Sequence, residues 1–196
     1  MDIKLILSLI SIPVVIFLFA PYIRDTIQQK TQPHIYTWLI WSITMSIALV
    51  WWYQWWWGNL MFITLWIPTL FVMIVFLLSC KYWTSDITLF DTVMLLLAIS
   101  SILFLFFMKN PLFAVILASL ADGLWYIPTY RKTFKLPHSE TLIFWIGSIW
   151  VGILQIGTLQ MYNVTTILYI ATITIANIGL VCIIIARRKY LLKKQQ

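Results

Sequence analysis

The sequence predicts an all-α integral membrane protein with seven transmembrane helices, and three observations lead to this prediction. Hydrophobic residues make up 62% of the chain and charged residues only 10%, whereas soluble domains have about 25% charged residues. No Asp, Glu, Lys or Arg occurs between Thr31 and Cys80 or between Thr141 and Ala186. A stretch that begins at Pro21 also returns, in altered form, at Pro128.

Each uncharged stretch is long enough for two spans, because one span needs about 20 apolar residues. We expect helices, since a bilayer provides no water to satisfy open backbone groups. Barrel strands would alternate apolar and polar residues, and these runs are continuously apolar. The seven expected spans are residues 4–21, 35–56, 60–80, 87–107, 111–129, 141–160 and 164–186.

The chain contains an internal duplication. Pro21–Thr26 and Pro128–Thr133 share Pro, Arg and Thr at a shift of 107 residues, and Pro33-His34 returns as Pro137-His138 at a shift of 104. One span precedes each copy and two follow it, so a single linker span separates two units of the same direction. The predicted regions are 1–83 (first three-helix repeat), 84–109 (linker helix) and 110–196 (second three-helix repeat with a basic tail).

The basic residues predict the orientation, since Lys and Arg concentrate in cytoplasmic loops. With the N-terminus outside, both copies of the duplicated stretch become inner loops, and eleven of the thirteen basic residues lie inside. Only Lys4 and Lys109 then lie outside. The basic tail at residues 187–194 is expected to contact anionic membrane lipids. The net charge of +7 is explained by this orientation, so nucleic acid is not expected as a partner.

This 3+1+3 arrangement, with a proline and a basic loop after the first and fifth spans, resembles the SWEET and PQ-loop superfamily of seven-helix transporters. The Pro-Gln of that family stands here as Pro21-Tyr22 and Pro128-Thr129. The chain is therefore also similar to small prokaryotic seven-helix proteins with a Pro-Thr-Tyr/Phe-Arg-Lys loop. The resemblance implies a prokaryotic plasma (inner) membrane and a substrate site between the two repeats, as in transporters built from parallel repeats.

The resemblance also implies particular binding residues. In SWEET proteins an Asn in the last helix of each repeat contacts the substrate. Asn177 matches this residue in the seventh span, whereas the third span offers only Thr69 after Pro68. The implied pocket is thus asymmetric.

Asp122 is the most informative single residue. It lies about eleven residues, or ~16 Å, along the fifth span from Pro111 at 1.5 Å per residue. A carboxylate at that depth costs at least ~2.5–3.5 kcal/mol, so it should face protein or a water-filled cavity. It is either a proton relay or substrate ligand, or a structural hydrogen-bonding group that pairs with Tyr126 or a backbone amide. Val15 holds the equivalent place in the first repeat.

Other polar and aromatic side chains in the spans are weaker candidates. Ser148 is a candidate for lining a cavity, whereas Ser42, Ser46 and Gln155 are expected mainly to join helices. Trp41 and Trp145 occupy the same repeat position. They form either a pair of inner-gate aromatics in contact with substrate or anchors at the lipid interface.

Four prolines are candidate hinges. Proline removes a backbone donor and bends a helix, and bent helices are plausible hinges in a transporter that rocks between two states. In a static bundle the same prolines are only packing features. They are Pro13, Pro21, Pro68 and Pro128.

The motifs leave two function classes. No metal-ligand spacing, nucleophile–base motif or phosphate loop occurs, so we expect no enzyme, no metal and no cofactor. A retinal photoreceptor is excluded because the seventh span has no Lys. The first class is a facilitator or proton-coupled carrier of a small polar metabolite, such as a sugar, working by alternating access. The second is a non-transporting membrane sensor or assembly partner. The sequence leaves a homo-oligomer open.

Overall fold

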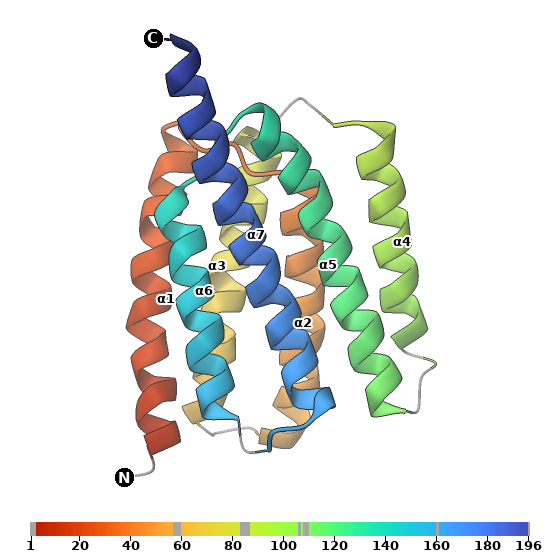
Figure 1. Ribbon diagram of the computed structural model, residues 1–196. Coiled ribbons are helices and arrows are strands. Elements are labelled where there is room, and N and C mark those ends of the chain that lie inside the picture. The colour runs from red at the N-terminus through yellow and green to blue at the C-terminus, as the bar shows by residue number, and fades with distance from the viewer. Residues whose placement is uncertain are drawn as a thin grey trace.

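The chain is all-helical, as expected. The computed structural model describes residues 3–56, 60–82, 87–105, 107, 110–159 and 161–195, and this part of the chain contains seven α-helices and no strand (Figure 1). Lys109 and the predicted boundary between residues 83 and 84 lie outside the described residues. The helices are α1 (Ile3–Ile27), α2 (Ile35–Trp56), α3 (Leu60–Tyr82), α4 (Leu89–Leu105), α5 (Pro111–Lys135), α6 (Leu142–Thr158) and α7 (Val164–Gln195).

Three helices run further than the apolar runs predict. Helix α1 continues through Pro21 to Ile27, α5 continues through Pro128 to Lys135, and α7 continues through the basic tail. The expectation that each duplicated stretch is a loop from its proline onward is therefore wrong. A proline removes one backbone donor but does not forbid the turns that follow it. Basic residues in the last turn of α5 also interact favourably with the helix dipole.

Six of the helices pack side by side into a closed ring. Helix α1 packs against α3, α3 against α2, and α2 against α5; the ring then continues through α7 and α6 back to α1 (Figure 1). The two chain termini lie at opposite ends of the bundle (Figure 1). The packing order around the ring is therefore α1–α3–α2–α5–α7–α6.

Helix α4 lies outside this ring, against α5 and α2 (Figure 1). Its first turn is held by reciprocal hydrogen bonds: Asp91 accepts from the Thr88 backbone N–H at 2.8 Å, and the Thr88 hydroxyl accepts from the Asp91 N–H at 3.3 Å. The Arg131 guanidinium on α5 donates to Asp91 Oδ2 at 2.5 Å. A small apolar cluster completes the contact, comprising Ile40, Ala98, Ile102, Ala121 and Trp125.

The outer surface is typical of a membrane protein. In the described residues, three helices are long and apolar enough to cross a membrane, within Leu9–Ile27, Leu65–Tyr82 and Thr166–Lys194. Large apolar side chains such as Phe17 and Leu77 are exposed. Soluble monomers rarely expose large contiguous apolar patches, so these surfaces indicate membrane association.

Candidate functional site

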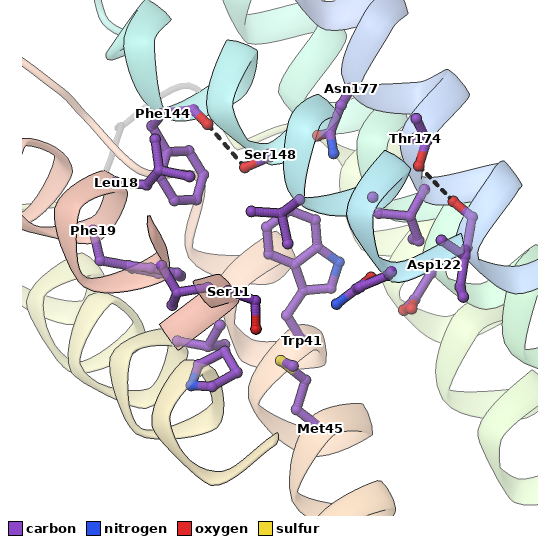
Figure 2. Close-up of a pocket in the computed structure, with 18 of the residues that line it drawn as sticks. Ser11, Leu18, Phe19, Trp41, Met45, Asp122, Phe144, Ser148, Thr174 and Asn177 are labelled. Carbon is purple, nitrogen blue, oxygen red and sulfur yellow. Dashed lines mark hydrogen bonds between the residues drawn. The ribbon is translucent and has the colours of Figure 1, made fainter. Parts of the chain in front are cut away.

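The ring of helices encloses a cavity of about 220 Å³ (Figure 2). All six ring helices contribute to its lining, and none of its described lining residues comes from α4. The walls are mainly apolar, with a few polar groups at separate points. The lining residues are Ser11, Val15, Leu18, Phe19, Trp41, Met45, Leu65, Pro68, Val72, Asp122, Tyr126, Phe144, Ser148, Val151, Gly152, Gln155, Tyr169, Ile170, Ile173, Thr174 and Asn177.

Asp122 lines this cavity from the middle of α5 and is 1% exposed. The Tyr169 hydroxyl on α7 donates to its Oδ2 at 2.5 Å. Its Oδ1 has no hydrogen-bond partner among the described residues. Tyr126, the partner that the sequence suggests for Asp122, bonds elsewhere. One carboxylate oxygen of Asp122 therefore accepts a hydrogen bond from the protein, and the other accepts none from the described residues.

Asn177 lies in the same cavity, on α7 (Figure 2). The Tyr126 hydroxyl donates to Asn177 Oδ1 at 2.8 Å. This bond uses one of the two lone pairs of the Asn177 amide oxygen, and the N–H groups of the side chain remain to donate to a ligand. The structure thus brings Asp122 and Asn177 together, each held by a tyrosine hydroxyl.

The hydroxyl groups in the cavity wall are already used as donors. Ser148 donates to the Phe144 carbonyl at 2.8 Å and Thr174 to the Ile170 carbonyl at 2.7 Å (Figure 2). Each hydroxyl keeps its oxygen lone pairs free to accept. The cavity wall therefore presents hydrogen-bond acceptors at these two positions.

The first half contributes mostly apolar surface. Val15 lines the cavity from α1, across the ring from the Asp122 that corresponds to it in the duplication. Pro68 also lines it, whereas Thr69 does not; the buried Thr69 hydroxyl donates to the Leu65 carbonyl at 2.7 Å. The structure thus does not bring Thr69 to the other candidates.

The remaining candidates separate into three groups. Gln155 lines the cavity, although we expected it mainly to join helices. Ser42 and Ser46 donate to carbonyls of their own helix at 2.8 and 2.6 Å. Pro13 and Pro21 lie within α1 and Pro128 within α5, and both helices continue past them.

An aromatic layer lies between the cavity and the end of the bundle that holds the duplicated stretches. Trp41 and Trp145 meet there, with ring centroids 6.1 Å apart. Trp145 is 1% exposed and its indole N–H donates to Glu140 Oε2 at 2.9 Å, so it is not a lipid anchor. The layer comprises Phe19, Tyr22, Trp38, Trp41, Tyr126, Phe144 and Trp145.

Beyond the aromatic layer the two connecting loops are joined through buried polar groups. The Lys132 ammonium pairs with Glu140 and also donates to the Gln32 carbonyl. The Gln32 N–H donates to the Ser139 carbonyl at 3.0 Å. We call this set the loop junction; it comprises Asp25, Thr31, Gln32, Lys132, Ser139, Glu140 and Thr141.

Asp25 and Lys132 hold equivalent positions in the duplication and have opposite charges. Asp25 on α1 accepts from the Thr141 hydroxyl at 3.0 Å, so each residue reaches the loop of the other half. Sequence reasoning missed this junction because it counted Lys132 only as a loop charge. The signal was the exchange of acid for base at a repeated position.

The basic tail also contributes to this end of the bundle. Arg188 donates to the Pro137 carbonyl at 2.9 Å and to the Glu140 carbonyl at 2.8 Å. Arg187 donates to the Phe134 carbonyl at 2.8 Å. The first two residues of the tail therefore bind the end of α5 and the loop that follows it, a role that the sequence did not predict.

His34 is buried beside Asp91, with its Nε2 3.8 Å from Asp91 Oδ2. Burial lowers the pKa of His34 to about 4, and the positive charges of Lys132 and Arg131 act in the same direction. His138, its counterpart in the duplication, is exposed. The two histidines therefore have different environments despite their equivalent positions.

No three His, Cys, Asp or Glu residues in the described part of the chain lie close enough together to hold a metal ion. The cavity wall offers a carboxylate, an amide and aromatic surface. Comparison with protein-family models, curated proteins and solved structures found no match to this chain.

Proposed function

We propose that this chain is a membrane transporter that moves a small polar metabolite by alternating access between two three-helix repeats. The observation that carries the proposal is the cavity lined by all six ring helices, with a buried carboxylate in its wall. Substrate sites of parallel-repeat transporters lie at the interface between the repeats. The alternative is a non-transporting sensor or assembly partner.

The order of packing supports two parallel repeats. The order α1–α3–α2 corresponds to α5–α7–α6, and the two joints between the halves, α1 with α6 and α2 with α5, correspond as well. Helix α4 then serves as the linker, with the repeats at residues 1–83 and 110–196. The proposed orientation has the N-terminus outside and the basic C-terminus in the cytoplasm, in a prokaryotic plasma membrane.

In alternating access the two halves move relative to each other, and this movement occurs at the joints between them. At the α2–α5 joint, the Thr37 and Thr129 hydroxyls share a hydrogen bond of 2.9 Å, and Thr37 also donates to the Trp125 carbonyl at 3.1 Å. The loop junction and aromatic layer close the proposed cytoplasmic side. Opening that side requires both the junction and the Trp41–Trp145 contact to part, while the prolines within α1, α3 and α5 serve as hinges.

The cavity volume limits the solute. A cavity of about 220 Å³ equals the share of about seven liquid waters at ≈ 30 Å³ each. Covalently bonded atoms pack more densely than waters, so this suits a solute of roughly ten non-hydrogen atoms. A single sugar or an amino compound is within this range, whereas an oligosaccharide is too large.

Uptake into liposomes that contain the purified protein tests the proposal. We expect a sugar, amino acid or other small metabolite to enter at least several-fold faster than into empty liposomes. If an inward pH gradient drives uptake, Asp122→Asn should abolish the effect of the gradient. The matched control is Ser100→Ala on α4, since the Ser100 hydroxyl donates to the Leu96 carbonyl of its own helix, away from the cavity. Absence of uptake for every solute would favour the sensor or assembly partner.

A further inference from the structure

The described residues that line the cavity include an acidic side chain but no basic one. Asp122 lies in its wall at 1% exposure, and no Lys, Arg or His is among the described lining residues. A buried carboxylate without a partner of opposite charge is costly. The protein compensates only part of this cost, because Asp122 Oδ1 has no partner among the described residues.

Asp122 Oδ2 accepts a hydrogen bond from the Tyr169 hydroxyl at 2.5 Å. The other nearby hydroxyl, that of Tyr126, is committed to Asn177. The lone pairs of Asp122 Oδ1 therefore remain to accept a hydrogen bond from a ligand in the cavity.

Two hydroxyl groups and an indole ring of the wall also favour a positively charged ligand. Ser148 and Thr174 present acceptor oxygens, because their hydroxyl hydrogens bond carbonyls of their own helices. Trp41 lies in the wall with Asp122 on one side and Phe19 on the other (Figure 2). A cation within about 6 Å of an indole face is attracted by the ring.

We propose that the cavity binds a small protonated amine, whose ammonium group donates to Asp122 Oδ1 and whose apolar part packs against Trp41 and Phe19. This assignment rests on the proposed function, since it names the class of solute that the transport site takes. A neutral sugar would leave the carboxylate uncompensated, and an anionic solute would be repelled by it. A hydroxyl or carbonyl oxygen at the far end of the amine could accept from the Asn177 amide.

Three probes of the same shape test this assignment on the intact purified protein in detergent. They are cyclohexylamine, cyclohexanol and cyclohexanecarboxylate, which share one ring and differ in charge. A ligand that binds only the folded state stabilises it by RT ln(1 + [L]/Kd), so at equal concentration the tighter ligand raises the unfolding temperature more. We expect cyclohexylamine to bind at least tenfold more tightly than cyclohexanol, and cyclohexanecarboxylate to give no shift.

Two variants test whether Asp122 is responsible for the preference for cyclohexylamine. Asp122→Asn should reduce the affinity for cyclohexylamine to that for cyclohexanol. Asp91→Asn removes a carboxylate on α4, outside the ring and the cavity lining, and should keep the preference for the amine. If Asp122→Asn does not fold, the comparison of the three probes on the unchanged protein still decides.

Equal binding of the amine and the alcohol would overturn the assignment and leave transport of a neutral solute standing. A stabilisation by sodium chloride that equals that by the amine, and that disappears in Asp122→Asn, would also overturn it in favour of an inorganic cation. If the amine binds selectively but no solute enters liposomes, the proposed transport fails while the assigned ligand class stands.

Discussion

Lys132 and Glu140 form a buried ion pair at the end of the bundle where the two connecting loops meet. The same carboxylate accepts from the Trp145 indole at 2.9 Å and from the Tyr22 hydroxyl at 3.4 Å. One side chain thus joins the aromatic layer to the loop junction. Because the pair is buried, its charges are weakly screened and each depends on the other.

Glu140→Gln should destabilise the protein by about 3–5 kcal/mol, because it leaves the Lys132 charge buried and unpaired. The measurement is thermal or denaturant unfolding in detergent. The double variant Lys132→Met/Glu140→Gln should recover part of this loss, since neither charge is then buried alone. A single variant as stable as the unchanged protein would contradict the buried ion pair.

Arg131→Met should loosen α4 without disturbing the ring. Asp91 would lose a charge-assisted hydrogen bond that contributes about 1.5–3 kcal/mol, and α4 packs only against α5 and α2 in the described part of the chain. Amide hydrogen exchange in α4 should accelerate about tenfold or more, while exchange in α6 and α7 stays unchanged.

The matched control is Arg24→Met, at the equivalent position of the first duplicated stretch. Arg24 pairs with its neighbour Asp25 at 2.9 Å but its side chain is largely exposed. Exposed ion pairs contribute little to stability, so exchange should stay as in the unchanged protein. Equal acceleration by both variants would contradict a specific role of Arg131.

Stability should fall between about pH 6.5 and pH 4 because of His34. Its pKa is lowered to about 4 in the folded protein, against about 6.5 in the unfolded chain. The unfolded state therefore binds the proton first, and the free energy of unfolding decreases as pH falls through this window. The loss reaches about 3 kcal/mol at 1.36 kcal/mol per pKa unit.

Unfolding temperatures measured across this pH window check the prediction for His34. His34→Gln should flatten the pH dependence, whereas His138→Gln should leave it intact because His138 is exposed. A pH dependence that survives in His34→Gln would assign it to another group.

Gly152→Ala should destabilise the α6–α7 contact by about 1–3 kcal/mol. A Cβ at this position would lie 2.1 Å from Thr174 Oγ1 and 3.3 Å from its Cβ, so the two helices would have to shift. Gly157→Ala on the same helix is the control, since its Cβ would meet only Leu7 Cδ1 at 3.9 Å. Unfolding temperatures of the two variants in detergent provide the comparison, and equal values would contradict the close approach.

Much of the helical architecture could be predicted from the sequence because it depends on local properties. The length of each apolar run and the position of the tight connections are encoded within about 20 neighbouring residues, which is the scale of one span. The helix ends past Pro21 and Pro128 were not predictable in this way. Those turns contain charged residues, and their helical state depends on the contacts that the charges make.

The candidate site was predictable only in part. The depth of Asp122 and Asn177 in apolar runs marked them, and the structure places both in one cavity. The sequence could not determine that Tyr169 rather than Tyr126 pairs with Asp122, because that choice depends on how α7 packs against α5. It also could not show that Thr69 is not among the residues that line the cavity.

The sequence by itself determined the helices, their apolar surfaces and the duplication, since these follow from residue type and spacing. Only the tertiary structure determined which residues form the loop junction and which side chains Glu140 binds. Its partners include Lys132, eight residues away, and Tyr22, 118 residues away. Such pairings are set by the order in which helices meet around the ring, and that order is a property of packing rather than of any local pattern.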